Sequence, residues 1–303
     1  NYKSSSRDVR TILEIFKKEK VDMVLIDLRK NGGGSLLESI NLTGLFIDQG
    51  PVVQVKDNHN RTQLLLDTEA GVAWSGPLVV LTSHMSASAS EIFAGAIQDY
   101  RRGIIVGDPA THGKGTVQQI MDLNRQLFRR PTKRVNLGAL KLTIQKFYRP
   151  NGETTQLRGV LPDVALPSIA EATGHGESKL EFSLPFDTVT ASSFTPYAFT
   201  NPKLIGKLTE QSADRQKDSA EMQALTKTYN RVRLSQQSKT IPLNQQKYLA
   251  AFADQPPTPP TTTPSAEKEG AKSGPTGPYL TEVLAIARDY FQLLNEAKIT
   301  IDS

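Results

Sequence analysis

The segment that decides the fold runs from Leu78 to Gln119 and reads LVVLTSHMSASASEIFAGAIQDYRRGIIVGDPATHGKGTVQQ. A continuous apolar strand, 78–81, leads through a serine-rich turn into a helical pattern whose apolar residues share one face. A second short strand, 103–107, follows, and a turn then brings Lys114 to the head of a further strand. Strand, helix and strand in this order predict one crossover of a layered α/β fold.

This crossover places a serine at the N-terminus of a helix and brings a lysine back towards that serine. A serine hydroxyl is a weak nucleophile at neutral pH and needs a nearby base. Because the chain has only four histidines among 303 residues, a lysine is the natural candidate. Lys114 could act as a base only if burial or another cation lowers its pKa well below the usual value of about 10.4.

Three serines compete for the role of nucleophile: Ser86, Ser88 and Ser90. If the helix begins at Ala89, then Ser88 is its N-cap and forms a capping box with Glu91. The unpaired N–H groups of the first turn would then point at the group that Ser88 attacks, which is the geometry of an oxyanion hole. The alternative is that Ser88 only caps the helix and that Lys114 is a solvated turn residue.

The motifs of this segment resemble those of the S41 serine peptidase family, the carboxy-terminal processing proteases, and especially its tail-specific branch. The resemblance is carried by Ser86–Ala94, Gln98–Tyr100 and Gly113–Gln119. It implies that Ser88 is the nucleophile, that Lys114 is the general base, that Gln118 orients this lysine, and that Asp99 also belongs to the site. Between Pro109 and Gly113 the chain has one residue more than the family pattern.

A glycine triplet follows the apolar stretch 21–28, which predicts a buried strand. Glycines between a strand and a helix expose backbone N–H groups to an anion or an oxyanion. The triplet lacks the Gly-Lys-Ser/Thr ending of a Walker A phosphate loop. The run from Asp27 to Gly34 also resembles an S41 signature, which implies that the amide of Gly33 or Gly34 completes an oxyanion hole with the amide of Ala89. A plain tight turn is the alternative.

Composition excludes several classes of protein. The chain has no cysteine, which rules out disulfide scaffolds, thiolate zinc sites and a cysteine nucleophile. No apolar run approaches the roughly 20 residues of a membrane span. A formal net charge of +5 raises the question of nucleic acid. We interpret the densest basic patch as a solvated loop, with an anion-binding patch as the alternative; it comprises Arg125, Arg129, Arg130, Lys133 and Arg134.

The length predicts more than one domain, since single cores seldom grow beyond roughly 250 residues. The resemblance implies a crotonase-like or Clp-like layered α/β core followed by a mainly helical C-terminal region. We expect the S41 core over 1–168, the helical region over 169–253, a linker rich in Pro, Thr and Gly over 254–278, and over 279–303 a C-terminal helix that packs with the helical region.

We therefore predict a serine endopeptidase that forms an acyl-enzyme and uses no metal or other cofactor. The resemblance implies protein substrates with unstructured apolar C-termini, a possible adaptor protein, a periplasmic location in a bacterium, and a PDZ domain that this chain does not include. We expect no nucleic-acid partner and no membrane span. The rival hypotheses are a non-catalytic protein-binding module on the same core and an acyl-CoA enzyme of the same fold class.

Overall fold

The computed structural model describes residues 3–124, 136–168, 176–237, 243–247 and 277–299. The basic patch at 125–134 and nearly all of the predicted linker lie outside these residues. The described part contains a parallel sheet of order β1-β4-β5-β8 and an antiparallel sheet of order β3-β2-β7-β6. The first comprises β1 (Val24–Asp27), β4 (Leu78–Thr82), β5 (Ile104–Gly107) and β8 (Val164–Ala165); the second comprises β2 (Gly50–Asp57), β3 (Thr62–Asp67), β6 (Thr116–Asp122) and β7 (Ala139–Tyr148).

Helices pack on both sides of the parallel sheet, so the chain is an α/β protein with a helical C-terminal region, as the sequence predicts. They are α1 (Ser5–Lys18), α2 (Leu36–Thr43), α3 (Ala89–Asp99), α6 (Pro202–Asp218), α7 (Ala220–Gln237) and α9 (Pro278–Glu296), with a short helical turn, η1, at Glu177–Lys179. None of the described helices combines the length and apolarity that crossing a membrane requires.

The strands of the parallel sheet are apolar because both of their faces are covered. Leu78 and Val80 pack in a cluster with α1 and α3, whereas Val79 and Leu81 pack in a cluster with α6 and α9. The predicted strands at 78–81 and 103–107 are confirmed. The strand predicted over 21–28 is shorter, because its pairing with β4 begins only at Val24, opposite Leu78.

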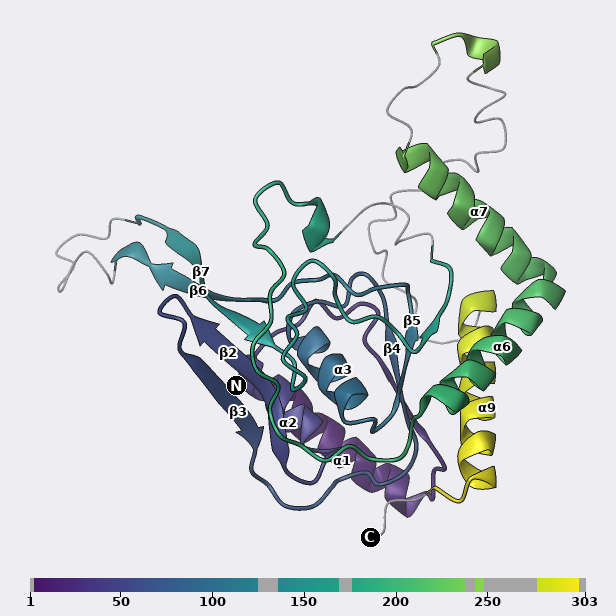
Figure 1. Cartoon of the computed structure of the whole chain (residues 1–303), viewed down its shortest axis with the longest axis horizontal. Coiled ribbons are helices and arrows are strands. Elements are labelled where there is room, and N and C mark those ends of the chain that lie inside the picture. The colour runs from purple at the N-terminus through teal and green to yellow at the C-terminus, as the bar shows by residue number, and fades with distance from the viewer. Residues whose placement is uncertain (1–2, 125–135, 169–175, 238–242, 248–276, 300–303) are drawn as a thin grey trace.

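Helix α3 lies between the two sheets (Figure 1). Its residues Phe93, Ala94 and Ile97 pack towards the parallel sheet. On the opposite face, Ile92, Ala96 and Tyr100 join β2 and β7 in a separate cluster. Every residue from Ser90 to Ile97 is buried. Since burying one large apolar side chain stabilises a fold by about 1.5–3 kcal/mol, these contacts fix the helix that begins next to Ser88.

Helices α6 and α9 cover the remaining face of the parallel sheet, on the far side from β2 and β3 in Figure 1. Buried side chains of both helices join Val79 and Val106 in one hydrophobic cluster, among them Leu208 of α6 and Ile286 and Tyr290 of α9. The amphipathic helix predicted near the C-terminal end is therefore confirmed, and it contributes directly to the core of the parallel sheet.

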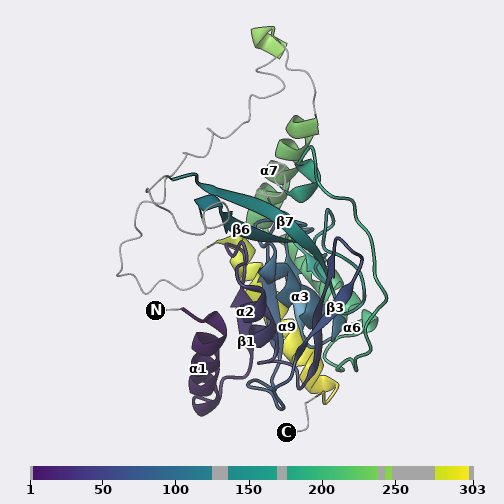
Figure 2. The same cartoon turned by 90° about the vertical axis from the view of Figure 1, so that its left-hand side faces the viewer.

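Helix α1 stands beside α2 at one edge of the molecule (Figure 2). Glu38 of α2 joins them, because its carboxylate accepts hydrogen bonds from the hydroxyls of Ser4, Ser5 and Ser6 and from the Ser6 N–H. Burial alone would raise the pKa of Glu38, but these donors lower it to about 2. The ionised carboxylate thus fixes the start of α2, directly after the glycine triplet.

Candidate active site

Three loops meet at one edge of the parallel sheet. The glycine triplet follows β1, Ser88 follows β4, and Lys114 follows β5. These strands are neighbours in the order β1-β4-β5 and run parallel, so their carboxyl ends lie at the same edge. In open α/β sheets, ligands bind at this edge. The topology therefore brings together residues that are far apart in the sequence.

Ser88 is the N-cap of α3 and has an unusual backbone conformation, with φ +57° and ψ −116°. A positive φ is strained for a residue with a side chain and persists only where the surroundings enforce it. Gly33 packs directly against this turn: a Cβ there would lie 2.5 Å from the Ala87 carbonyl oxygen and 2.9 Å from the Ser88 Cβ. Only a glycine fits so close to the strained serine.

The structure separates the three candidate serines. The Ser86 hydroxyl is buried and donates to the Leu28 carbonyl at 2.8 Å. The Ser90 hydroxyl donates to the Asn31 carbonyl at 2.9 Å. Ser88 forms the predicted capping box with Glu91 and is partly exposed, whereas Ser86 and Ser90 are buried. Ser88 is thus the member of the run whose hydroxyl remains available to a substrate.

Glu91 is fully buried and holds the turn of Ser88 and the turn of Lys114 together. One carboxylate oxygen, Oε2, accepts from the backbone N–H groups of Ser88 at 2.7 Å and Lys114 at 3.0 Å. The other, Oε1, accepts from the Thr111 hydroxyl at 2.6 Å and the Gly113 N–H at 2.7 Å. Burial raises the pKa of Glu91 to about 7, while these four donors oppose that rise.

The shared oxygen of Glu91 places the backbones of Ser88 and Lys114 within two hydrogen-bond lengths of each other. Burial lowers the pKa of Lys114, and the nearby charge of Lys141 lowers it further; Glu177 and Glu91 act in the opposite direction. A general base must be neutral to accept a proton, so a lowered pKa favours that function near neutral pH.

The turn between Pro109 and Gly113, which has one residue more than the family pattern, is bound to the N-terminal end of α3 and its surroundings. Besides donating to Glu91, the Thr111 hydroxyl accepts from the Val160 N–H at 2.8 Å. The backbone N–H of His112 donates to the Ser86 carbonyl at 3.0 Å. The longer turn is therefore bound at successive residues before it reaches Lys114.

The predicted oxyanion hole draws on the backbone N–H groups of Ala89 and of Gly33 or Gly34. The Gly33 N–H donates to the Asn31 side chain at 2.9 Å, so it is already occupied. Among the described residues, no hydrogen bond is present for the N–H of Gly34 or Ala89. A cavity of about 70 Å³ adjoins both residues, and its lining mixes apolar side chains such as Leu28, Leu42 and Phe93 with polar ones such as Asn31 and Glu38.

The family model of the S41 peptidases (Peptidase family S41) matches residues 1–166, which is more than half of the chain. The chain belongs to peptidase family S41. A second model, the C-terminal domain of tail specific protease, matches residues 170–259.

Two named relatives agree with this assignment, and one solved structure is similar over part of the chain. This S41 chain is 46% identical over 193 residues to the tail-specific protease of Haemophilus influenzae, covering 64% of the chain and 27% of the relative. It is 34% identical over 159 residues to the carboxy-terminal-processing protease of Bartonella bacilliformis, covering 52% of the chain and 34% of the relative. The photosystem II D1 C-terminal processing protease is 28% identical, with a TM-score of 0.46 over 55% of this chain and 40% of that one. The chain thus spans well under half the length of these relatives.

Asp99 lies at the opposite end of α3 from Ser88. At about 1.5 Å of rise per residue, the two are roughly 16 Å apart along the helix. Asp99 is buried in an ion pair with Arg149, and it also accepts from the Asn151 N–H at 3.2 Å. Burial raises the pKa of Asp99, and the Arg149 charge opposes that rise. The geometry places this predicted site residue where it anchors α3 to the segment after β7.

Gln118 lies in β6, opposite Thr143 of β7, at an irregularity in the pairing. Its side chain is exposed, and no hydrogen bond joins it to Lys114 among the described residues. Two residues further along, Ile120 pairs with Lys141, the residue whose charge acts on Lys114. The orienting role of Gln118 remains a prediction.

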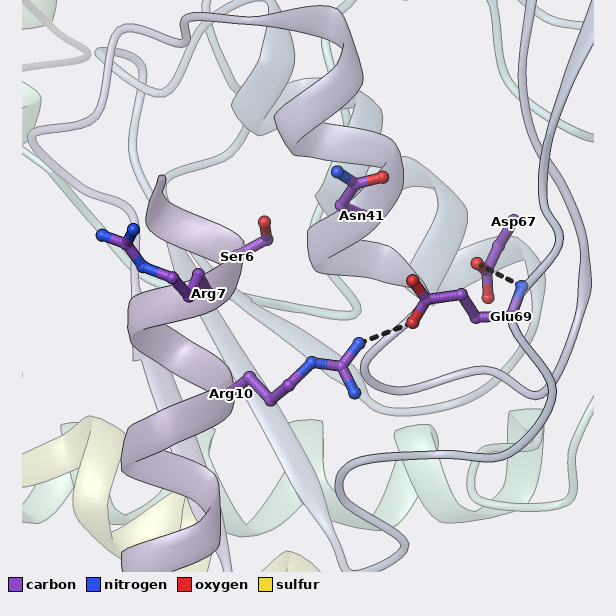
Figure 3. A pocket seen from close by; sticks show the side chains of 6 residues that line it. All are labelled: Ser6, Arg7, Arg10, Asn41, Asp67 and Glu69. Atoms are coloured by element: carbon purple, nitrogen blue, oxygen red, sulfur yellow. Dashed lines mark hydrogen bonds and ion pairs between the residues drawn. The ribbon is translucent and has the colours of Figure 1, made fainter. Parts of the chain in front are cut away.

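Two further cavities lie away from Ser88. One, of about 180 Å³, lies between α1, α2 and the segment after β3, where Arg10 and Glu69 form an ion pair at 2.7 Å (Figure 3). The other, of about 880 Å³, lies at the C-terminal end of α3 and is lined by Tyr100, Phe194 and Tyr197 among others. Neither contains a predicted site residue.

Sequence reasoning missed several residues around Lys114. Glu91 is recognisable as half of a capping box, but its contacts with Thr111 and Gly113 join positions at least 20 residues apart. No sequence motif marks Lys141 or Glu177 as neighbours of Lys114. Lys141 approaches Lys114 through the pairing of β6 with β7, and Glu177 approaches it through the position of η1. A motif shows which residues are near in sequence, whereas these contacts depend on topology.

Proposed function

We propose that this chain is the catalytic part of a serine endopeptidase in which Ser88 is the nucleophile and Lys114 the general base. The observation that carries the proposal is the buried Glu91 carboxylate, which binds the backbones of both residues through one oxygen. Membership of the S41 family, a helix N-terminus at Ser88 and the lowered pKa of Lys114 support it.

In this mechanism, neutral Lys114 takes the proton of the Ser88 hydroxyl as the oxygen attacks the peptide carbonyl carbon. The tetrahedral intermediate collapses, and Lys114 returns the proton to the departing amine. Lys114 then deprotonates a water molecule that attacks the ester, releasing a carboxylic acid and restoring Ser88. Gln118 orients the lysine amine in this proposal. Every proton that moves passes through Lys114.

We assign the oxyanion hole to the N–H groups of Ala89 and Gly34. Ala89 is the first residue of α3, where the unpaired N–H groups and the helix dipole favour negative charge. Gly34 is preferred to Gly33 because the Gly33 N–H already donates to Asn31. Gly33 instead allows the close approach of the glycine triplet to the Ser88 turn.

The cavity beside Gly34 and Ala89 is the proposed site for the substrate side chain that precedes the cleaved bond. Its volume of about 70 Å³ favours a small side chain, for which Leu28, Leu42 and Phe93 provide apolar contacts among polar lining residues. A larger residue at this substrate position would be excluded by Phe93 and the α2 residues that close the cavity. This preference follows from the geometry of the oxyanion hole and can be tested with peptides that differ at one position.

The proposed substrates are proteins with unstructured apolar C-termini. Support comes from the relatives, one of which is named a tail-specific protease and another a carboxy-terminal-processing protease. A periplasmic location and an adaptor protein belong to the same proposal. The chain spans only 27% of the first of these relatives. We therefore do not assign selection of the tail to any residue of this chain.

The test compares Ser88→Ala and Lys114→Ala with Lys203→Ala, which removes an exposed lysine of α6. The substrate is an unfolded protein that ends in an apolar tail. Both site variants should lose at least about a thousandfold in kcat/KM, while their circular dichroism and Tm match those of the parent chain. Lys203→Ala should cleave normally. Full activity of Lys114→Ala would refute the assigned base, and full activity of Ser88→Ala would favour the alternative in which Ser88 is only a cap.

A further inference from the structure

An exposed apolar turn lies on the segment that follows η1. The Ser183 N–H donates to the Leu180 carbonyl at 3.4 Å and closes the turn. Phe182 is 88% exposed, and Leu180 and Leu184 are 56% and 41% exposed. Turns are normally built from Gly, Pro, Asn, Asp and Ser, so three large apolar side chains here call for a physical reason. We name residues 180–184 the apolar turn.

The apolar turn is held at both ends. Before it, the Glu177 N–H donates to the His112 carbonyl at 2.9 Å. After it, Asp187 accepts from Lys56 at 3.0 Å and from Tyr148 at 3.1 Å, and the Pro185 carbonyl accepts from Lys146 at 2.8 Å. These contacts fix the path of the backbone, so Phe182 is presented to solvent from an anchored loop.

The first anchor connects the apolar turn to the Lys114 site. The Gln156 side chain accepts from the Gly115 N–H at 2.8 Å and donates to Glu177 at 3.0 Å, which ties η1 to the residue after Lys114. Phe182 is five residues beyond Glu177. Since an extended chain spans at most about 3.3–3.6 Å per residue, Phe182 lies within roughly 18 Å of Glu177. This bound is counted from Glu177, which Gln156 joins to the residue after Lys114.

We propose that the apolar turn is a docking site for the unfolded polypeptide substrate, and that Phe182 binds an apolar side chain of that polypeptide several residues from the bond cleaved at Ser88. This inference rests on the proposed function and extends it. In Figure 1 the teal segment around residue 180 stands out from the core, where a long chain can reach it. An unfolded polypeptide is the occupant that fits, because it exposes apolar side chains at intervals and must extend away from the site.

The physical basis is burial of surface that the free protein leaves in water. Phe186, the next aromatic residue, already packs against the Arg158 guanidinium at 3.7 Å. Among the described residues, no ring or cation contact occupies Phe182. An aromatic ring on an anchored turn contributes a large contact area at low cost in conformational entropy. The turn would thus add affinity for long unfolded chains and none for short peptides.

The test measures binding in the Ser88→Ala background, where no cleavage interferes. The probe is a fluorescein-labelled ten-residue peptide of Ala, Leu and Val, followed by fluorescence anisotropy. Phe182→Ser should weaken its binding about tenfold, because the bound peptide loses the contact with one large apolar side chain. The control is Leu161→Ser, which removes another exposed apolar side chain, 59% exposed, near the far end of α3. It should bind the peptide normally.

A second measurement separates this inference from the proposed function. With Ser88 intact, Phe182→Ser should raise KM for the ten-residue peptide about tenfold and leave the cleavage of a four-residue peptide unchanged. Equal binding by the Phe182→Ser and Leu161→Ser proteins, or no saturable binding by the Ser88→Ala chain, would overturn the docking site. If the binding difference holds but the chain with Ser88 cleaves neither peptide, then the proposed function fails and the docking site stands.

Discussion

The two carboxylate oxygens of Glu91 accept four hydrogen bonds. Replacing one of these oxygens with an NH₂ group tests whether this single residue positions Ser88 and Lys114. Glu91→Gln places an amide NH₂ against backbone N–H donors in a fully buried position. We expect the free energy of unfolding to fall by about 2–4 kcal/mol and kcat to fall with it. Urea denaturation and peptide cleavage measure the two effects.

The control for Glu91→Gln is Glu14→Gln on the exposed face of α1, which should change neither quantity. If Glu91→Gln were as stable and as active as the parent chain, the carboxylate would not hold the two turns together. The account of how Ser88 and Lys114 are positioned would then be wrong.

Two charged residues near Lys114 should shift the pH dependence of cleavage in opposite directions. Lys141 lowers the pKa of Lys114 and Glu177 raises it. Because the base must be neutral, kcat/KM should rise as pH increases through the pKa of Lys114. Lys141→Met removes a lowering influence and should move this midpoint to higher pH. Glu177→Gln removes a raising influence and should move it to lower pH.

The pH profiles of the parent chain and the two variants are measured with one peptide substrate. A shift of both midpoints in the same direction would contradict the electrostatic account of the lysine. Unchanged midpoints in both variants would show that some other group limits the activity.

At this scale the sequence motif selects a candidate nucleophile, whereas the hydrogen bonds around it are visible only in the structure. The serine-rich motif and the helix start pointed to Ser88 rather than Ser86 or Ser90, and the structure shows hydrogen bonds that occupy the other two hydroxyls. The sequence left Gly33 and Gly34 equivalent. Only the hydrogen bond from the Gly33 N–H to Asn31 distinguishes them, because it depends on how the triplet folds back.

At the scale of the elements, Asp99 tests whether α3 is positioned from its far end. Asp99→Asn leaves the Arg149 guanidinium buried without its partner carboxylate, which should cost about 3–5 kcal/mol of stability. We expect a lower Tm and partial loss of cleavage, with the pH profile of the remaining activity unchanged. Thermal unfolding and kinetics at a temperature well below the new Tm separate the two effects.

Asp22→Asn, at an exposed position just before β1, is the control and should leave Tm unchanged. A variant Asp99→Asn that keeps the parent Tm but cannot cleave would mean that Asp99 acts in the chemistry, against its position at the end of α3.

The elements follow the hydrophobic pattern closely where they are buried on two sides. The helix from Ala89 and the strands β4 and β5 appear where the apolar residues predict them. The sequence could not predict the irregular pairing of β6 with β7 beside Gln118, since register depends on the partner strand. For the same reason, the approach of Lys141 to Lys114 required the structure.

At the scale of the whole molecule, the position of α9 predicts that the C-terminal helices and the S41 core unfold together. Ile286 is fully buried against the parallel sheet, and Ile286→Ala should lower the free energy of unfolding by about 2–5 kcal/mol. Trp74, the single tryptophan, reports on the opposite face of that sheet. In Ile286→Ala, the unfolding transitions followed by Trp74 fluorescence and by helical circular dichroism should both move to lower denaturant concentration, by the same amount.

Leu284→Ala, on the partly exposed side of α9, should have a much smaller effect. If Ile286→Ala moved the helical signal and left the Trp74 transition in place, α9 would belong to a unit that folds separately from the S41 core.

The sequence predicts α9 as an amphipathic helix but not the surface that it covers. Its pattern shows one apolar face, and many buried surfaces could accept such a face. The structure supplies the partner: the residues of β4 and β5 that point away from α3 join α9 in one cluster. A parallel sheet must be covered on both faces, so this face requires the helices that follow the S41 region.

The central claim is that Ser88 reacts covalently and needs Lys114 to do so. The most direct measurement is peptide mapping by mass spectrometry after reaction with a fluorophosphonate, which labels activated serines. The account predicts one adduct, on Ser88, that is absent from Ser88→Ala and strongly reduced in Lys114→Ala. Labelling of Ser86 or Ser90 in place of Ser88, or undiminished labelling of Ser88 in Lys114→Ala, would contradict it.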